Sequence, residues 1–351
     1  MGVVVSVQSI DSVVGTEISA LSFLDHLQLV LAESLTSSTY KYALLWALAD
    51  ICVEQPCEPT AELTIPIPRI AEQFLLIYWR HGLPYGSGVH DEGGGVLLQN
   101  RGPQASVIGR ANDLRRRFGT PAAARRDPAW SREIRWLAAL LDDMPLWRLQ
   151  RLRTTTVDCF YAENRGENSV TLRTGVAYNF RRFHSLVVRL VQAEWMAFLH
   201  ELPANQAILG SAGDLGDFLF GPQRDCLALV RDPLIELQSG RCFYCEERLV
   251  ASTDVDHFIP WSRYPRNLMH NLVAAHRRCN TMKSNILPAM AHYVRWRNHV
   301  DRLDEPLRGI ADKAGILADR ATAIQVAEWC YDEARRVRAE VWLGGDDFER
   351  L

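Results

Sequence analysis

The 351-residue chain lacks any apolar run long enough to cross a membrane. A transmembrane helix needs about 18 to 20 uninterrupted apolar residues. The longest candidate, residues 42–53, is shorter and already contains Asp50. Residues 1–11 also lack a basic stretch followed by an apolar core, so we expect no secretory signal and a cytoplasmic protein without a membrane partner. In that compartment most of the eight cysteines would stay reduced.

A strong net charge is absent too. The value of −3 gives no reason by itself to expect a nucleic-acid partner. The charges are unevenly distributed, however. Residues 1–100 hold 3 basic and 11 acidic residues, whereas residues 101–190 hold 17 arginines and 8 acidic residues. This central basic block either follows a phosphate backbone or forms solvated helix faces and salt bridges, and the sequence leaves both interpretations open.

Apolar residues recur at helical spacing through most of the chain, which predicts a mainly α (α+β) protein. One short strand is expected at residues 170–173, and an exposed loop at 81–95. Some pair of the first three helices could form a helix-turn-helix, although an ordinary helical core is the simpler interpretation. The expected helices cover residues 21–35, residues 40–53, a segment after Pro68, residues 104–143 with a turn at 119–128, residues 180–198, and residues 225–237 with a break or kink at Pro233.

Two pairs of potential metal ligands share the same spacing. Cys242 and Cys245 are separated by two residues, and so are His276 and Cys279 further along the chain. Two thiolates on a tight knuckle can face one zinc ion, and the second pair would complete a tetrahedral set of three sulfurs and one nitrogen. A single such pair is weak evidence, but two pairs at matched spacing predict a structural zinc site.

Between these pairs lies the segment 254–260, Asp-Val-Asp-His-Phe-Ile-Pro. In an extended segment, alternation places Asp254 and Asp256 on one side and His257 on the other. A histidine can activate water as a base, and a carboxylate can hold a hard cation. The alternative is that His257 is a packed histidine that orients the loop.

Three polar residues follow. Asn271 precedes the second ligand pair, and Asn280 comes directly after Cys279. A zinc ion at Cys279 would fix the start of a helix and aim Asn280, whose amide oxygen suits magnesium or manganese. Lys283, one of only three lysines in the chain, lies one helical turn later. Its expected role is a phosphate contact, and an ordinary exposed lysine is the alternative.

The order Cys-x-x-Cys, Asp-x-Asp-His-x-x-Pro, Asn-Leu and His-x-x-Cys-Asn-x-x-Lys resembles the HNH family of nucleases, which have a ββα-metal core. The resemblance covers about 45 to 60 residues, and one departure is that a histidine takes the first place of the second zinc pair, where cysteine is common. It implies that His257 is the general base, that Asp256 and Asn280 bind a catalytic Mg²⁺ or Mn²⁺, and that Asn271 holds the histidine loop in shape. The structural zinc ligands that it implies are Cys242, Cys245, His276 and Cys279.

The implied function is metal-dependent hydrolysis of DNA phosphodiester bonds, leaving 5′-phosphate and 3′-hydroxyl ends. A zinc-stabilised DNA-binding protein without catalysis, or an HNH nuclease acting on RNA, are the alternatives. We expect an accessory region at 1–221, the HNH nuclease domain at 222–300, and helices packing on it at 301–351. Double-stranded DNA is the expected partner. A second copy of the chain or a defence-system protein could be another, because the large accessory region resembles restriction or phage-defence effectors in architecture.

Overall fold

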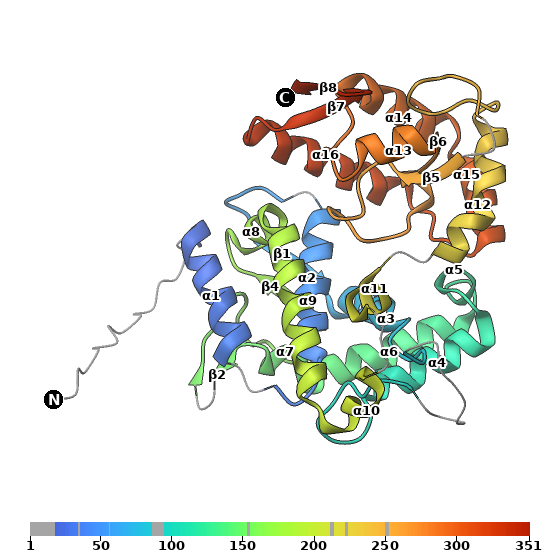
Figure 1. Cartoon of the computed structure of the whole chain (residues 1–351). Coiled ribbons are helices and arrows are strands. Elements are labelled where there is room, and N and C mark those ends of the chain that lie inside the picture. Colours follow the sequence, from blue (N-terminus) through green and yellow to red (C-terminus); the bar gives the residue numbers. More distant parts are fainter. Residues whose placement is uncertain are drawn as a thin grey trace.

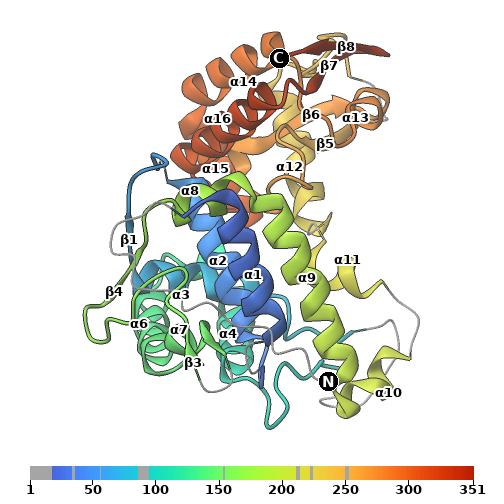
Figure 2. The same ribbon diagram turned by 90° about the vertical axis from the view of Figure 1, so that its left-hand side faces the viewer.

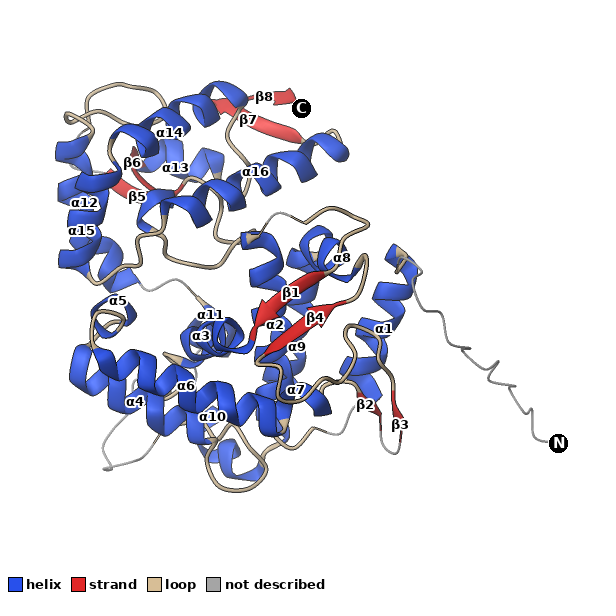
Figure 3. Cartoon of the chain, turned by 180° about the vertical axis from the view of Figure 1, so that it is seen from behind, coloured by secondary structure: helices blue, strands red, loops and turns tan. Residues whose placement is uncertain are grey.

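The computed structural model describes residues 18–33, 36–55, 57–85, 95–152, 155–210, 214–221, 224–249 and 253–351. Helices dominate these residues, and the strands form small antiparallel pairs set among them (Figure 3). The expected mainly α fold with small β elements is confirmed. The loop expected at 81–95 lies mostly outside the described residues. Within the described ranges, no helix is both long and apolar enough to span a bilayer.

The N-terminal part is built mostly from helices, with two small strand pairs, β1–β4 and β2–β3. Its elements are α1 (Ala20–Glu33), α2 (Tyr40–Glu54), β1 (Leu63–Pro66), α3 (Ile67–Tyr78), α4 (Ser106–Phe118), α5 (Pro121–Ala124), α6 (Pro128–Asp143), α7 (Pro145–Arg148), β2 (Arg151–Leu152), β3 (Thr155–Thr156), β4 (Ser169–Leu172), α8 (Val176–Arg182), α9 (His184–Glu201), α10 (Gln206–Leu209) and α11 (Leu215–Phe220).

The C-terminal part lies beside the ends of α2 and α8 (Figures 1 and 2). It contains the strand pairs β5–β6 and β7–β8. Its elements are α12 (Arg224–Leu237), β5 (Thr253–His257), β6 (Leu272–His276), α13 (Arg277–Lys283), α14 (Met290–Arg302), α15 (Asp304–Ala314), α16 (Arg320–Arg336), β7 (Glu340–Gly344) and β8 (Asp347–Arg350).

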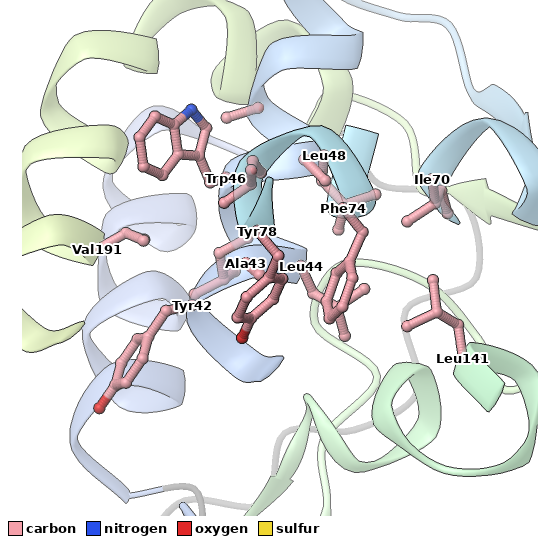
Figure 4. Close-up of a cluster of buried hydrophobic side chains, with 14 of the residues drawn as sticks. Tyr42, Ala43, Leu44, Trp46, Leu48, Ile70, Phe74, Tyr78, Leu141 and Val191 are labelled. Carbon is pink, nitrogen blue, oxygen red and sulfur yellow. The ribbon is translucent and has the colours of Figure 1, made fainter. Parts of the chain in front are cut away.

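The central helix of the N-terminal part is α2. All of its residues from 41 to 54 are buried, because other helices surround it. Side chains of α2, α3, α6 and α9 meet in its core (Figure 4), for example Leu44 with Phe74 and Tyr78 nearby. A helix buried in this way cannot lie in a DNA groove. The ordinary helical core is therefore what the structure shows for α2, rather than a recognition helix.

Three expected elements differ from the structure. The helix expected over 180–198 is interrupted at Phe183, whose φ of −104° and ψ of 17° are not helical. Of the break or kink expected at Pro233, the structure excludes the break, because α12 continues through Pro233 to Leu237. The C-terminal region does not consist of helices alone. It ends in the hairpin β7–β8, whose turn uses the positive φ angles of Gly344 and Gly345.

The buried apolar residues form two clusters. The first comprises residues of the N-terminal part up to Phe220, and the second runs from Val230 to Trp342. One residue of α2, Val53, belongs to the second cluster. The last turn of α2 thus packs against the C-terminal part, although the rest of the helix lies in the N-terminal core.

Candidate metal centre and active site

The two ligand pairs predicted from spacing meet in the structure. Their potential ligand atoms all lie within 4.8 Å of one another. Cys242 and Cys245 lie on a tight turn that is closed by the backbone hydrogen bond from Glu246 to Cys242, with a φ of 60° at Glu246. His276 is the last residue of β6, and Cys279 lies in the first turn of α13. These four side chains could hold a metal ion.

The ring of His276 is oriented for metal binding. Its Nε2 lies 3.0 Å from the backbone oxygen of Arg248, an acceptor, so Nε2 carries the hydrogen and donates it. The other nitrogen, Nδ1, faces the cluster and lies 3.3 Å from the sulfur of Cys245. In a neutral imidazole that leaves the lone pair on Nδ1. A carbonyl partner of this kind commonly fixes the orientation of a metal-binding histidine.

The pKa of the Cys279 thiol reflects its neighbours in the cluster. Burial, together with the neighbouring sulfurs of Cys242 and Cys245, raises the pKa of the Cys279 thiol to about 12. Three sulfurs this close repel one another as thiolates. A metal ion among them would reverse that effect, because it stabilises the deprotonated form. Three sulfurs and one imidazole nitrogen are a donor set that suits zinc.

The hairpin β5–β6 and helix α13 carry the remaining candidate residues. The strands pair from Thr253 opposite His276 to His257 opposite Leu272. The side chains of Asp254 and Asp256 both contact residues of α13, whereas His257 contacts the loop that follows β5. The alternation expected from the sequence is therefore present.

Asp256 and Lys283 form a buried ion pair. The nitrogen of Lys283 lies 3.1 Å from Oδ2 of Asp256, and the Lys283 side chain is fully buried. The same oxygen accepts a 2.5 Å hydrogen bond from the hydroxyl of Tyr244. Lys283 also donates to the backbone oxygen of His257. The phosphate contact expected of Lys283 does not fit this position, because its ammonium group points into the protein and is already paired.

Asn280 contacts Asp254. Its Nδ2 donates to Oδ2 of Asp254 over 3.2 Å. The sequence analysis paired Asn280 with Asp256 as ligands of one cation. In the structure Asn280 bonds to Asp254 and Asp256 to Lys283, both on the α13 side of the strand pair. Asp254 lies two residues before Asp256, so the period of a strand already indicated that both face the same way.

Asn271 holds the loop after His257 by two hydrogen bonds. Its Oδ1 accepts from the backbone nitrogen of Ile259 at 2.7 Å, and its Nδ2 donates to the backbone oxygen of the same residue at 2.9 Å. Its own backbone oxygen accepts from Phe258. The side chain is buried, so water cannot replace these bonds. These contacts are those that the sequence analysis assigned to the middle residue of the motif.

We expect Asn271→Ala to lower the free energy of unfolding by about 2–4 kcal/mol, because two buried backbone groups of Ile259 would lose their partner. Urea denaturation measures this effect. The neighbouring exposed pair gives the control: Arg277→Ala removes only a surface contact to Asp254 and should change stability by less than about 1 kcal/mol. Equal effects of the two variants would contradict the assignment.

The buried position of Lys283 leads to a second prediction about stability. Lys283→Met should lower the free energy of unfolding by about 3–5 kcal/mol, because Asp256 would keep a buried charge without its partner. Lys313→Met, at an exposed lysine of α15, is the matched control and should be nearly neutral. If Lys283→Met weakened DNA binding while leaving stability unchanged, the phosphate contact would be correct and the buried pair would not.

His257 is nearly buried and has two neighbours in the loop. Its Nε2 lies 2.8 Å from Oδ1 of Asn267, and its ring meets that of Trp261 at 5.2 Å. Burial lowers the pKa of His257, although the hydrogen bond to Asn267 and the charge of Asp256 act in the opposite direction. The ring is therefore neutral near pH 7, as a base must be before it accepts a proton. The sequence analysis did not identify Asn267, because no motif marks it.

Much of the central basic block is engaged within the protein. Arg110 pairs with Glu133 at 2.9 Å and Arg125 with Glu72 at 3.1 Å, and Arg126 pairs with Asp312. Other arginines of the block bind backbone oxygens. For these residues the structure shows the salt-bridge alternative rather than a free basic surface.

The antiparallel pair β5–β6 is followed directly by helix α13, and three cysteines and a histidine gather beside the junction of β6 and α13. This arrangement is similar to the ββα core of HNH nucleases. Residues 242–289 match the model of the HNH endonuclease family. The chain therefore contains an HNH endonuclease module, which spans the cluster, β5, β6 and α13. Residues 20–85 match the model of a domain of unknown function, DUF8808. The chain matches no curated protein and no solved structure.

Proposed function

We propose that the protein is a metal-dependent endonuclease that hydrolyses DNA phosphodiester bonds through its HNH module. The observation that carries the proposal is the family match over the same residues that fold into the metal cluster, the hairpin and α13. The proposed catalytic residues are Asp256, His257, Asn271 and Asn280.

The proposed metal of the cluster is zinc. Zinc prefers four sulfur and nitrogen ligands at about 2.0–2.3 Å, which places the ligand atoms about 3.3–3.8 Å apart. The four ligand atoms here lie within 4.8 Å of one another, and small rotations of the side chains would close the set. Four protein ligands fill a tetrahedral zinc site and leave no open position, so the site would be structural, fixing the start of α13 relative to the knuckle.

The proposed catalytic cation is Mg²⁺ or Mn²⁺, held by oxygen atoms of Asp256 and Asn280. The contacts of Asp256 with Tyr244 and Lys283 both use Oδ2, which leaves Oδ1 for a metal ion. Asn280 uses Nδ2 to bind Asp254, so its amide oxygen is the atom available as a ligand. This proposal rests on the chemistry of these atoms.

In the proposed mechanism, neutral His257 removes a proton from a water molecule, which attacks the phosphorus in line. The bond from phosphorus to the 3′ oxygen breaks, so the products carry a 5′-phosphate and a 3′-hydroxyl. The cation, when bound, supplies stabilisation of the charge that develops on the phosphate and the departing oxygen. Asn271 keeps the backbone after His257 in place through Ile259. One such site cuts one strand, so a double-strand break would require two copies of the chain or two events.

We further propose that the large N-terminal part recognises a target, senses a signal or binds a partner, as in restriction or phage-defence effectors. Support for this comes from architecture alone: a substantial helical part with its own core precedes a small nuclease module.

Nicking of supercoiled plasmid DNA tests the proposed function. We expect cutting with Mg²⁺ or Mn²⁺, none with EDTA, and ends that a ligase can seal. Single-stranded DNA, modified phage DNA and structured RNA belong in the same assay. Cutting of RNA alone would replace DNA as the substrate. DNA binding without cutting of any of these nucleic acids would favour the zinc-stabilised binding protein.

A further inference from the structure

Two acidic side chains of α2 reach from the N-terminal part into the HNH module. Asp50 and Glu54 are four residues apart, so they lie on the same face of the helix. Both are buried. Each binds a residue of the segment 258–268, which connects β5 to the turn before β6 and which we call the histidine loop. Buried carboxylates are costly unless they are paired, so these contacts constrain where the loop can lie.

Asp50 joins three parts of the chain. Its Oδ1 lies 2.8 Å from Nε2 of His184, the first residue of α9. Its Oδ2 accepts from Nε and Nη2 of Arg266 at 3.0 and 2.5 Å. The side chain of Asp50 is fully buried, and that of Arg266 is 14% exposed. Arg266 and His184 together hold the pKa of Asp50 below its usual value in spite of its burial, so the carboxylate remains charged.

Glu54 makes the second connection. Its Oε1 accepts a 2.6 Å hydrogen bond from the hydroxyl of Tyr264, in the histidine loop. Its other oxygen, Oε2, accepts from Gln73 and Arg69 of α3. The ring of Tyr264 also lies beside that of His184, with the centroids 6.3 Å apart. Two neighbouring points of the histidine loop are therefore fixed to the N-terminal part.

The residue after Arg266 contacts the proposed base. Oδ1 of Asn267 lies 2.8 Å from Nε2 of His257, and Nδ2 of Asn267 points to the sulfur of Cys226 in α12 at 3.5 Å. An amide oxygen can only accept, so Nε2 of His257 carries the hydrogen and Nδ1 keeps the lone pair. The side chain of Asn267 thus selects the nitrogen that can take a proton from water.

Arg266 and Asn267 border a cavity. A cavity of about 120 Å³ lies between the two parts of the chain, lined by Arg266 and Asn267 on one side and by Trp46 and Ile77 on the other. Tyr264 and Leu268 of the same loop are buried in the second apolar cluster, so packing and polar contacts hold the loop together. The polar contacts that cross to the N-terminal part include the bonds that Asp50 and Glu54 make to Arg266 and Tyr264.

We propose that Asn267 is a positioning residue for His257, and that Asp50 and Glu54 of α2 hold the loop that presents it. The inference rests on the proposed nuclease function. It also gives a role to the segment that matches the domain of unknown function, which contains both acids. In this view residues 20–85 complete the nuclease site from outside the HNH module.

The first test compares kcat with DNA affinity in the full-length protein. Asn267→Ala should lower the plasmid-nicking kcat by about 10–100-fold while the Kd for DNA changes little, because only the orientation of His257 is lost. Asn267→Asp keeps an acceptor oxygen at the same place and should restore most of the rate. A purely structural role would not give this rescue.

The second test concerns the connection to α2. Asp50→Asn should lower kcat by about tenfold, since Arg266 loses its charged partner. The matched control is Gln150→Leu, because Gln150 is also buried in the N-terminal part but bonds only to residues of that part. Both variants are assayed well below their melting temperatures. If Asp50→Asn had the same kcat as Gln150→Leu, the proposed role of α2 would be overturned.

Nitrogen-15 spectra of the histidine rings separate this inference from the proposed function. We expect the Nε2–H form of His257 in the wild type and a shift toward the Nδ1–H form in Asn267→Ala and Asp50→Asn. If the wild type cuts no nucleic acid, the proposed function is wrong, but the spectra still show whether Asn267 sets which nitrogen of His257 carries the hydrogen. An unchanged ring form in Asn267→Ala would overturn the positioning role, whatever the activity.

Discussion

Replacing His257 by alanine is expected to reduce plasmid nicking by about 10²- to 10⁴-fold, the usual contribution of a general base. Its ring is nearly buried, burial lowers its pKa, and Asn267 leaves one ring nitrogen to act as the base. The reduction should fall on kcat rather than on DNA affinity. Since no metal ligand changes, the zinc content of the variant should equal that of the wild type.

The control for this prediction is His270→Gln. His270 is also a buried histidine of the HNH module, and its Nε2 lies 2.8 Å from Asp304. It is not one of the residues that match the HNH motif, and its contact with Asp304 places it against α15 rather than beside Asp256. It should retain most of the activity when assayed well below its melting temperature. Nicking by His257→Ala at the rate of the wild type would exclude His257 as the base.

Loss of the metal cluster is the second large expected effect. Binding of a structural zinc ion is worth about 10–16 kcal/mol in zinc-finger peptides, which is comparable to the whole stability of a domain. Cys279→Ser should therefore bind less than one zinc ion per chain and lose the ordered structure of the HNH module. The N-terminal part has its own apolar core and should retain its helical signal. Elemental analysis and circular dichroism during heating measure the two effects.

Cys330 provides the matched control for the zinc prediction. It is a buried cysteine of α16 in the second apolar cluster, and it does not belong to the metal-binding group. Cys330→Ala should keep one zinc ion per chain and lose only the packing of a small side chain. Zinc content in Cys279→Ser equal to that of the wild type would show that the cluster does not bind the ion through this thiol.

The sequence predicted those parts of the site that depend on local spacing. Two residues between Cys242 and Cys245 suffice to place both thiols on one turn, and the same holds for His276 and Cys279. The alternation in β5 could be predicted for the same reason, since it follows from the geometry of an extended chain. The helices α1 and α3 were predicted from apolar periodicity.

Contacts between distant segments could not be predicted in this way. Lys283 was expected to contact phosphate or to be an ordinary exposed lysine, yet in the structure its side chain is fully buried and pairs with Asp256. The pair of Asp50 with Arg266 joins residues 216 positions apart, and no local pattern marks either of them. The terminal hairpin was missed because Trp342 also fits a helical spacing, and only the two glycines of its turn indicate otherwise.

Val53 packs in the core of the C-terminal part, while Asp50 and Glu54 on the same helix bond to it. A fragment that begins at α12 would therefore expose an apolar patch, an unpaired arginine at 266 and the Tyr264 hydroxyl to solvent. Such a fragment would keep all four cluster ligands and every residue of the HNH motif. A nuclease fragment cut out at the boundaries of the motif should therefore bind zinc but have little activity. Co-expression of residues 1–221 should recover the activity by covering the exposed surface.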